Sequence, residues 1–212
     1  DNIYLISDAT SGDGVYGASI SFSRVQYPDR KGAAITAVQK GSDEDNVGLA
    51  FFTHPSAGAT DPIVETMRID AAGYVTKPFH PIISVSRDNN GITMTANEDL
   101  FASTSMLNWV VQGITHNTSN GRFTVPVAGK YYVHFFSMKN NTATAYFNVL
   151  KNGGSMGLRI YDTANATSWH SYGLGGVFTL AANDYLNVVC GDGATTNAHG
   201  SNHMNFTIHL IG

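Results

Sequence analysis

Short runs of alternating apolar and polar residues, separated by turns rich in Gly and Asn, recur along this 212-residue chain. Residues 131–136 and 204–210 show the two-residue period of a strand with one buried face. Residues 151–154 (Lys-Asn-Gly-Gly) separate two such runs, and Asn-Gly tolerates the positive φ of a tight hairpin turn. With 22 Gly and only 13% charged residues, long helices are disfavoured. The sequence therefore predicts an all-β protein.

The scarcity of charge also excludes several classes of partner. A net charge of −4 leaves no basic surface of the kind that binds nucleic acid. No segment approaches the roughly 18 consecutive apolar residues of a membrane-spanning helix, so membrane insertion is not expected. Cys190 is the single cysteine, which excludes an internal disulfide framework and a cysteine-rich zinc site. If the protein works outside a cell, we expect association between chains to stabilise it instead.

Two regions of the chain differ in their patterns. Residues 1–80 contain short segments rich in small residues, with too few large apolar side chains for a core of their own. Residues 77–81 (Lys-Pro-Phe-His-Pro) then favour extended backbone and interrupt any sheet. From residue 81 to residue 212 the alternating segments are denser and more regular, as in a sandwich or jelly roll. We therefore expect a β-rich stem that buries surface against other chains, followed by a separate head.

Residues 121–135 (GRFTVPVAGKYYVHF) resemble the core of the globular head of complement 1q. The resemblance continues into residues 180–188 and 205–211, which are similar to the last two strands of that family. His116 departs from the pattern, because the family usually has an aromatic residue there. The spacing that carries the resemblance involves Phe123, Gly129, Tyr131 and Phe135, with Val133 at another position that is usually aromatic.

The complement 1q family shares a trimeric jelly roll with tumour necrosis factor. The resemblance therefore implies that residues 81–212 form a jelly-roll head and that the protein is a homotrimer. The chain has no collagen-like Gly-X-Y stalk, which is a further departure from complement 1q. The resemblance implies a fold and an assembly, and says little about a ligand.

The first half of the chain has a different resemblance. Residues 31–39, 45–53 and 65–75 resemble, in that order, pieces of a shaft module of bacteriophage tail fibres. In those fibres the module is an intertwined trimeric β-rich stem that leads to a carboxy-terminal module. The resemblance implies the tip of a virion tail fibre, outside the cell, which recognises the bacterial host. The resemblance also implies further fibre segments before this one. Because the chain begins with Asp1 rather than Met, we expect a fragment or a processed chain.

Two glycine-rich motifs match catalytic or cofactor-binding patterns in sequence, but they lack the structural context that these patterns require. Residues 12–17 satisfy the dinucleotide-binding fingerprint, but an alternating segment follows instead of the helix that would hold pyrophosphate. Residues 153–157 satisfy the nucleophile-elbow pattern, but Ser155 follows a hairpin turn in a chain with no helical run. We expect no catalytic residues and no cofactor, and therefore no enzyme.

Carboxylates and histidines leave two other kinds of site to consider. Residues 43–45 and 98–99 are the only close acidic groups, and an acid–base pair of this kind could hydrolyse glycosides. Both lie in turn-like contexts, which favours solvated loop charge. His199 and His203 share a polar segment with Asp192 and could hold a divalent metal on a trimer axis. Isolated polar histidines are the more common case, so we expect no metal site.

The order of antiparallel strands predicts where a receptor would bind. If the chain enters the head near Pro81, the connections at 139–144, 162–168 and 191–203 lie at the far end. They are rich in polar side chains, with aromatic residues beside them, as in many glycan sites. Solvated loop tips are the alternative interpretation. The predicted receptor-binding residues are Lys139, Asn140, Asn141, Thr142, Asp162, Thr163, Asn165, Trp169, Asp192, His199 and His203.

Three functions are compatible with these features. The first is a homotrimeric tail-fibre tip that attaches without catalysis to the bacterial surface, with a polysaccharide as the expected receptor. The second is a structural fibre or surface-filament segment that has no specific ligand. The third is a depolymerase that degrades surface glycans.

Overall fold

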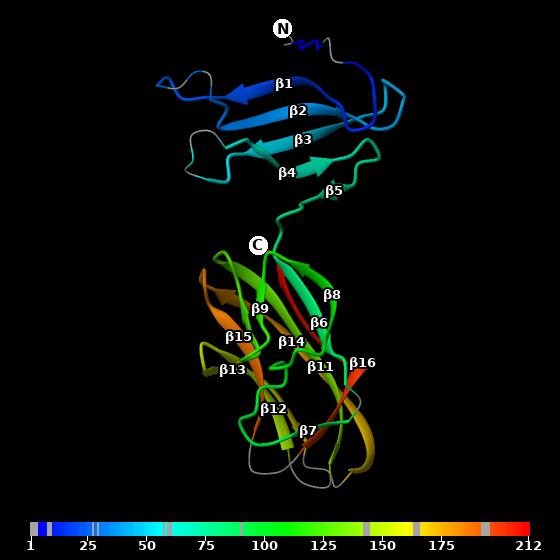
Figure 1. Ribbon diagram of the computed structural model, residues 1–212, viewed down its shortest axis with the longest axis vertical. Coiled ribbons are helices and arrows are strands. Elements are labelled where there is room, and N and C mark those ends of the chain that lie inside the picture. Colours follow the sequence, from blue (N-terminus) through cyan, green and yellow to red (C-terminus); the bar gives the residue numbers. More distant parts are fainter. Residues whose placement is uncertain are drawn as a thin grey trace. The chain divides into compact units, whose positions relative to one another are not determined.

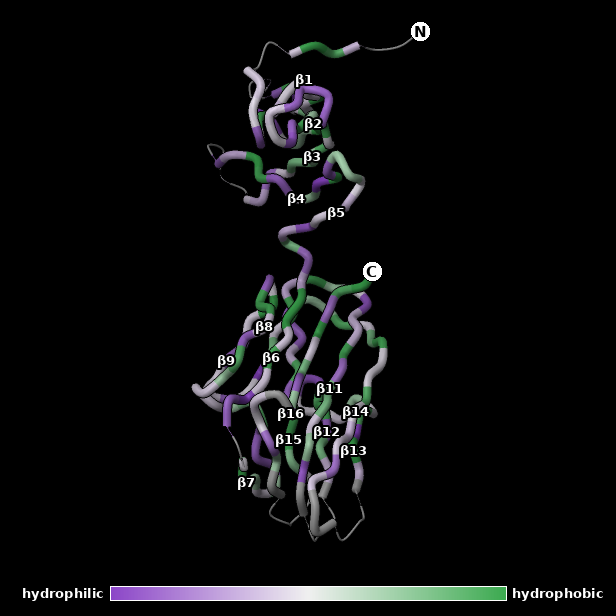
Figure 2. The backbone as a smooth tube through the Cα atoms, turned by 90° about the vertical axis from the view of Figure 1, so that its right-hand side faces the viewer, coloured by the Kyte–Doolittle hydropathy of each residue, from purple (hydrophilic) through white to green (hydrophobic). Residues whose placement is uncertain are grey.

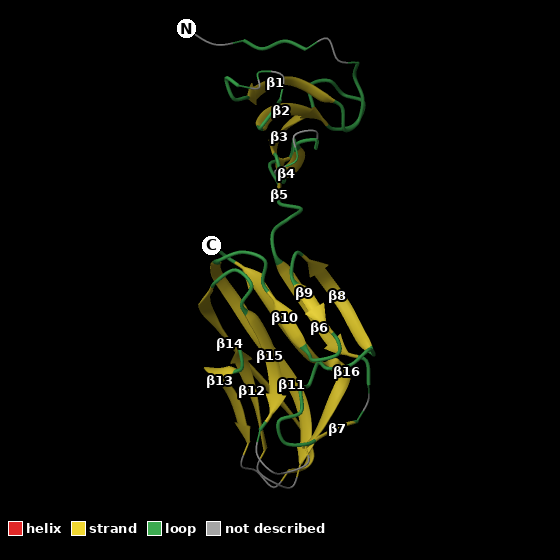
Figure 3. Cartoon of the chain, turned by 60° about the vertical axis from the view of Figure 1, so that its left-hand side comes forward, coloured by secondary structure: helices red, strands yellow, loops and turns green. Residues whose placement is uncertain are grey.

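The computed structural model describes residues 4–7, 10–26, 28, 30–56, 58, 61–89, 91–141, 145–162, 166–191 and 196–212. The regular structure of these residues consists of β-strands, which confirms the all-β prediction for this part of the chain (Figure 3). The chain divides into two compact units, Asp1–Phe79 and His80–Gly212, called unit 1 and unit 2 below (Figure 1).

Unit 1 contains one antiparallel sheet in which each strand pairs with the next along the chain. Hairpin turns join its strands, and Gly41 in the β2–β3 turn has a φ of 75°, which favours glycine. The strands are β1 (Tyr16–Phe22), β2 (Ala33–Gln39), β3 (Val47–Thr53), β4 (Val64–Ile69) and β5 (Val75–Thr76).

One face of this sheet is apolar and largely open. Residues that pair directly across the strands share a face, so the register assigns the members of each face. Several of these apolar side chains are exposed, including Phe22 (52%) and Leu49 (45%). No second layer within the described part of unit 1 covers them. This apolar face consists of Ile20, Phe22, Ile35, Val47, Leu49, Phe51, Met67, Ile69 and Val75.

The opposite face of the sheet carries small residues and one network of polar side chains. The Tyr16 hydroxyl donates to Glu65 at 3.0 Å, and the Arg68 guanidinium donates to both oxygens of the same carboxylate at 2.8 and 2.6 Å. The hydrogen bonds from Arg68 lower the pKa of Glu65. The Tyr16 ring also contacts Phe52 edge-to-face at 5.1 Å. Unit 1 therefore has side-chain contacts on this face and an uncovered surface on the other.

Unit 2 is a sandwich of two sheets, called the first and second sheet (Figures 1 and 3). The first sheet has the order β14-β11-β16-β6-β8, with β7 also paired to β16, and the second has the order β13-β12-β15-β10-β9. The strands are β6 (Ile82–Arg87), β7 (Ile92–Met94), β8 (Met106–Gln112), β9 (Thr115–Asn117), β10 (Arg122–Thr124), β11 (Gly129–Asn141), β12 (Ala145–Lys151), β13 (Gly154–Asp162), β14 (Ala166–Leu180), β15 (Tyr185–Cys190) and β16 (Thr196–Leu210).

Phenylalanine rings from both sheets form the centre of unit 2. Phe135 and Phe206 come from the first sheet, Phe123 and Phe147 from the second, and Phe101 from the segment before β8. Ring centroids of contacting pairs lie 5.1 to 6.3 Å apart, mostly edge-to-face. All five side chains are almost completely buried, and such ring contacts stabilise a core beyond the area that they bury. Figure 2 shows hydrophobic and hydrophilic residues alternating along these strands.

The residues that carry the resemblance to complement 1q have structural roles. Phe123, Tyr131 and Phe135 are buried, and the Tyr131 hydroxyl donates to the Val127 carbonyl at 2.8 Å. A Cβ at Gly129 would lie 2.5 Å from the end of the Leu210 side chain and 3.0 Å from the Gly212 carbonyl oxygen, so a larger residue would require Leu210 to shift. His116 takes over the aromatic role that its position usually has. Its imidazole stacks on the Phe123 ring at 4.2 Å and contacts the Phe101 carbonyl through Nε2 at 3.1 Å.

The expected hairpin at residues 151–154 is confirmed. Asn152 and Gly153 both have positive φ, 51° and 82°, and connect β12 to β13. Asp184 accepts hydrogen bonds from the Asn152 side chain at 2.7 Å and from the Ala181 N–H at 2.8 Å. Lys151 lies 2.9 Å from the same carboxylate and, with these hydrogen bonds, lowers the pKa of Asp184 to about 2.

Asp99 is a partly buried carboxylate inside unit 2. It accepts hydrogen bonds from the Phe101 N–H at 3.0 Å and from the Asn187 side-chain amide at 2.7 Å. The Asn187 Oδ1 beside it is buried and lacks a hydrogen-bond partner among the described residues. Burial raises the pKa of Asp99 to about 6, since a charged carboxylate is poorly solvated there.

We expect Asp99 to make unit 2 less stable as the pH rises. Its pKa is higher in the folded chain than the ordinary 3.8, so ionisation lowers the free energy of unfolding between about pH 4 and pH 6. Relative to Asp99→Asn, the wild-type chain should lose about 2 kcal/mol between pH 4.5 and pH 7.5, at about 1.4 kcal/mol per pKa unit. Urea unfolding of both chains measures this difference, and a difference that is the same at both pH values contradicts the assignment.

Candidate functional site

The strand ends beside the three predicted receptor loops meet at one end of unit 2. Asn141 pairs with Ala166, Asn140 with Asn197, and Ala145 with Asp162. At the other end of the same sheets, Leu210 donates its N–H to the carbonyl of Pro81, where the chain enters unit 2. We call the end with the three pairs the distal end.

The connections at the distal end are shorter than the sequence indicated. β11 continues to Asn141, β14 begins at Ala166 and β16 begins at Thr196, so much of each expected loop is strand. His199, His203 and Trp169 accordingly lie on strands. The sequence pattern does not predict these strand ends, because their residues are polar and do not alternate with apolar ones. Backbone pairing across β11, β14 and β16 nevertheless continues through them.

A long bulge in β16 shapes the distal end. Ser137 of β11 pairs with Met204 and the next residue, Met138, pairs with His199, so residues 200–203 have no partner on β11. Gly200 donates its N–H to the Asn89 carbonyl at 2.7 Å, and a Cβ there would lie 2.2 Å from the same oxygen. Ser201 has a φ of 52°. The segment after β6 thus holds the bulge against the sheet.

The bulge brings three aromatic rings together on the outer face of the first sheet. The Trp169 and His199 rings lie 5.0 Å apart at 77°, and the His199 and His203 rings lie 4.4 Å apart at 81°. We call Trp169, His199 and His203 the ring cluster. Trp169 is 40% exposed and both histidines are half-buried, and His199 contacts the Gly200 carbonyl through Nδ1 at 3.2 Å. A sugar offers C–H groups and hydroxyls that match such a surface.

Lys139 requires a correction. It was expected in a loop, but it lies in β11 and is only 1% exposed, since its position alternates with Met138 and points into the sandwich. Its ammonium lies 5.7 Å from the centre of the Tyr172 ring. Lys139 therefore belongs to the interior of unit 2 and does not reach the distal surface.

The other predicted residues are placed only in part. Asn140 and Asn141 belong to β11 and Asp162 to β13, and of these residues only the backbone is described. Outside the described residues lie Thr142, Thr163, Asn165 and Asp192. Their role as receptor contacts stays a prediction.

The motifs that resemble catalytic sites have structural partners. Ser155 donates its hydroxyl to the Asn148 side chain at 3.3 Å, in the turn region between β12 and β13. The Glu98 carboxylate accepts from the Thr95 N–H at 2.9 Å, and Asp45 donates its N–H to Asp43 at 3.0 Å. Across the described residues, no three His, Cys, Asp or Glu side chains are placed to hold a metal ion. None of the described residues forms a helix long and apolar enough to span a membrane.

No family model and no curated protein sequence matches this chain. The globular domain of the zebrafish complement 1qA protein is structurally similar, with 18% identity and a TM-score of 0.51. The match covers 62% of this chain and 98% of that domain, and unit 2 makes up 133 of the 212 residues here. Unit 2 has the complement 1q fold.

Two other solved structures are similar to this chain. Eiger, a tumour necrosis factor from S. frugiperda, is 12% identical with a TM-score of 0.48, and the match covers 62% of this chain and 94% of that one. Murine APRIL is 15% identical with a TM-score of 0.46, and the match covers 62% and 99%. The predicted jelly-roll head is confirmed by the similarity to the complement 1qA domain alone.

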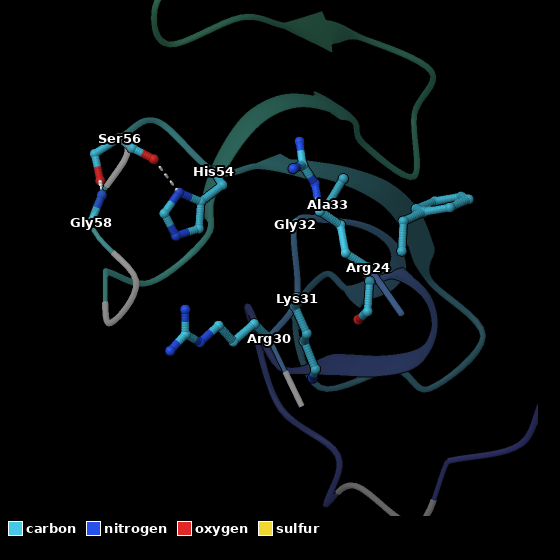
Figure 4. Close-up of a pocket in the computed structure, with 10 residues that line it drawn as sticks. Arg24, Arg30, Lys31, Gly32, Ala33, His54, Ser56 and Gly58 are labelled. Atoms are coloured by element: carbon cyan, nitrogen blue, oxygen red, sulfur yellow. Dashed lines mark hydrogen bonds between the residues drawn. The ribbon is translucent and has the colours of Figure 1, made fainter. Parts of the chain in front are cut away.

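Sequence reasoning missed a cavity in unit 1. Its volume is about 680 Å³, and three separate segments around residues 22–24, 30–33 and 54–58 form its wall. In Figure 4 the Arg30 side chain extends toward the loop that carries His54 and Ser56. In the sequence, the only indication of this cavity is that the cationic residues Arg24, Arg30 and Lys31 lie close together.

We expect Trp169→Ala to reduce binding to immobilised bacterial glycans about tenfold or more, because the sugar loses its stacking surface. Trp109→Ala is the matched control, since Trp109 is 58% exposed and lies on β8, the edge strand opposite β14 in the first sheet. Glycan-array binding of both variants measures the effect. Equal binding by the two variants would remove the ring cluster as the site.

Proposed function

We propose that this chain is the tip of a bacteriophage tail fibre, a homotrimer that attaches to the bacterial host without catalysis. Unit 1 would be the stem, joined to preceding fibre segments, and unit 2 the receptor-binding head. The expected receptor is a cell-surface polysaccharide, and the expected location is the virion. The order of the two resemblances along the chain, stem then head, supports this assignment.

The open apolar face of unit 1 is the observation that carries the proposal. A single sheet has two faces, and the apolar one, with Phe22 and Leu49 about half exposed, lacks a second layer within the described part of unit 1. Exposed contiguous apolar surface of this kind marks a contact with another molecule. Further copies of the same chain are the simplest cover, because each copy brings an identical face.

Unit 2 supports the same assembly and adds a binding surface. The outer face of its first sheet has the exposed side chains of Tyr132 (39%) and Val177 (56%), which pair across β11 and β14. Copies packed on this face would gather their ring clusters at the distal end. Three weak sites then act together, which raises the overall affinity without any new contact.

We expect the purified chain to have a mass of about 68 kDa in light scattering, three times 22.7 kDa. The fluorescently labelled protein should label particular strains in a panel of bacteria, and removal of their surface polysaccharide should abolish the labelling. A mass of one chain contradicts the assembly. Labelling of no strain favours the structural filament, and release of reducing ends from polysaccharide favours the depolymerase.

A further inference from the structure

The two ends of the unit 1 sheet differ in charge: cations are in excess at one end, where Asp61 also lies, and carboxylates are in excess at the other, where Lys40 also lies. At one end, where β1 and β3 finish and β2 begins, lie Arg24, Arg30 and Lys31. At the other end the β2–β3 turn presents Asp43, Glu44 and Asp45. All six of these residues are exposed.

The basic end is hollow. The cavity of about 680 Å³ is lined by the three cations, by His54 and by the apolar residues Phe22 and Ala33. Phe22 also belongs to the apolar face, so the cavity opens at the margin of the surface that requires cover. A ligand in this cavity would meet cationic side chains and an apolar wall together (Figure 4).

The acidic end is a turn closed by backbone hydrogen bonds. The β2–β3 turn is closed by hydrogen bonds from the Lys40 N–H to the Asn46 carbonyl at 2.8 Å and from the Asn46 N–H to the Asp43 carbonyl at 3.2 Å. Val47 follows the turn at once and is a member of the apolar face, with 44% of its surface exposed. The turn thus combines three carboxylates with an adjoining apolar side chain, and the cavity combines three cations with an apolar wall. The two surfaces are complementary in charge.

We propose that the 43–45 turn of one copy binds in the basic cavity of the next copy. This inference rests on the homotrimer proposed above and specifies its contact in unit 1. A contact between two different ends of the same sheet is head-to-tail, and three such contacts close a ring. The pairing also brings Val47 of one copy toward Phe22 of the next, so the apolar faces continue from copy to copy.

The net charge of unit 1 favours this occupant over a foreign polyanion. Residues 1–79 contain six Lys and Arg against ten Asp and Glu, a net charge of −4. Half of those six cations line one cavity, while the unit as a whole repels a large anion. In the proposed trimer, by contrast, the acidic turn of a neighbouring copy is already held close to the cavity.

Charge reversal tests the pairing in the full chain. Arg24→Glu/Arg30→Glu/Lys31→Glu reverses the basic end, and Asp43→Lys/Glu44→Lys/Asp45→Lys reverses the acidic end. Each triple variant should raise the concentration at which the trimer dissociates about tenfold or more, because like charges then face each other at three interfaces. The chain with all six substitutions should regain the wild-type value, since every contact is attractive again.

The sixfold variant is also the control for folding, because it contains every substitution and keeps the net charge of the wild type. A mixture of the two triple variants should form trimers more readily than either variant alone and less readily than the wild type, since a mixed ring of three has two attractive contacts and one repulsive contact. In the wild type, raising the salt from about 0.05 M to about 0.5 M should weaken the trimer, because the Debye length falls below about 5 Å. Light scattering across a dilution series measures all of these effects.

Each other result overturns the pairing in a distinguishable way. Triple variants that stay trimeric at every dilution refute it and leave the homotrimer standing. If the variant with the basic end reversed also loses retention on polyphosphate beads, the cavity binds a foreign anion instead. A folded sixfold variant that fails to assemble refutes it as well. A monomeric wild-type chain refutes the pairing together with the proposed trimer.

Discussion

A β-sheet has two faces, and the two halves of this chain satisfy that constraint differently. In unit 2 the second sheet covers the first, and rings such as Phe123 and Phe206 meet between them at 5.1 Å. In unit 1 the five strands form one layer. Its polar network around Glu65 lies on one face, together with Phe52, and the open apolar face with Phe22 and Leu49 is the other. The second half of the chain therefore has a core of its own, whereas the first half leaves one apolar face of its sheet open.

In unit 2 the backbone of β16, rather than the packing of the core, determines where the candidate site lies. The ring cluster exists because β16 holds four extra residues opposite two consecutive residues of β11. Gly200 allows the bulge to approach the backbone at Asn89, which fixes where His203 lies. The fold shared with complement 1q supplies the sheets, and the bulge brings the three rings of the candidate site together. A fold can be shared widely while such a site is particular to one chain.

The sequence predicts most of the strands, because period-2 alternation reflects one buried face. It fails for β14, where Gly173, Gly175 and Gly176 interrupt the alternation, although the backbone still pairs along β11. The prediction that Lys139 lies in a loop is also wrong. A lysine in a polar run is typical of a loop, but the alternation of side chains along β11 places Lys139 on the inner face of the sheet. The basic cavity is formed by three segments whose meeting depends on sheet register, and no local pattern contains that information.

The pairing of β6 has a mechanical consequence. The chain enters unit 2 at Pro81 and continues directly into β6, which pairs with β16 from Ile82–His209 to Val85–Phe206. The ring cluster lies toward the other end of β16. A tension between Pro81 and a ligand held there would act along the strands, at right angles to their hydrogen bonds. The bonds would then share the load in shear, so the head would resist being pulled open one bond at a time.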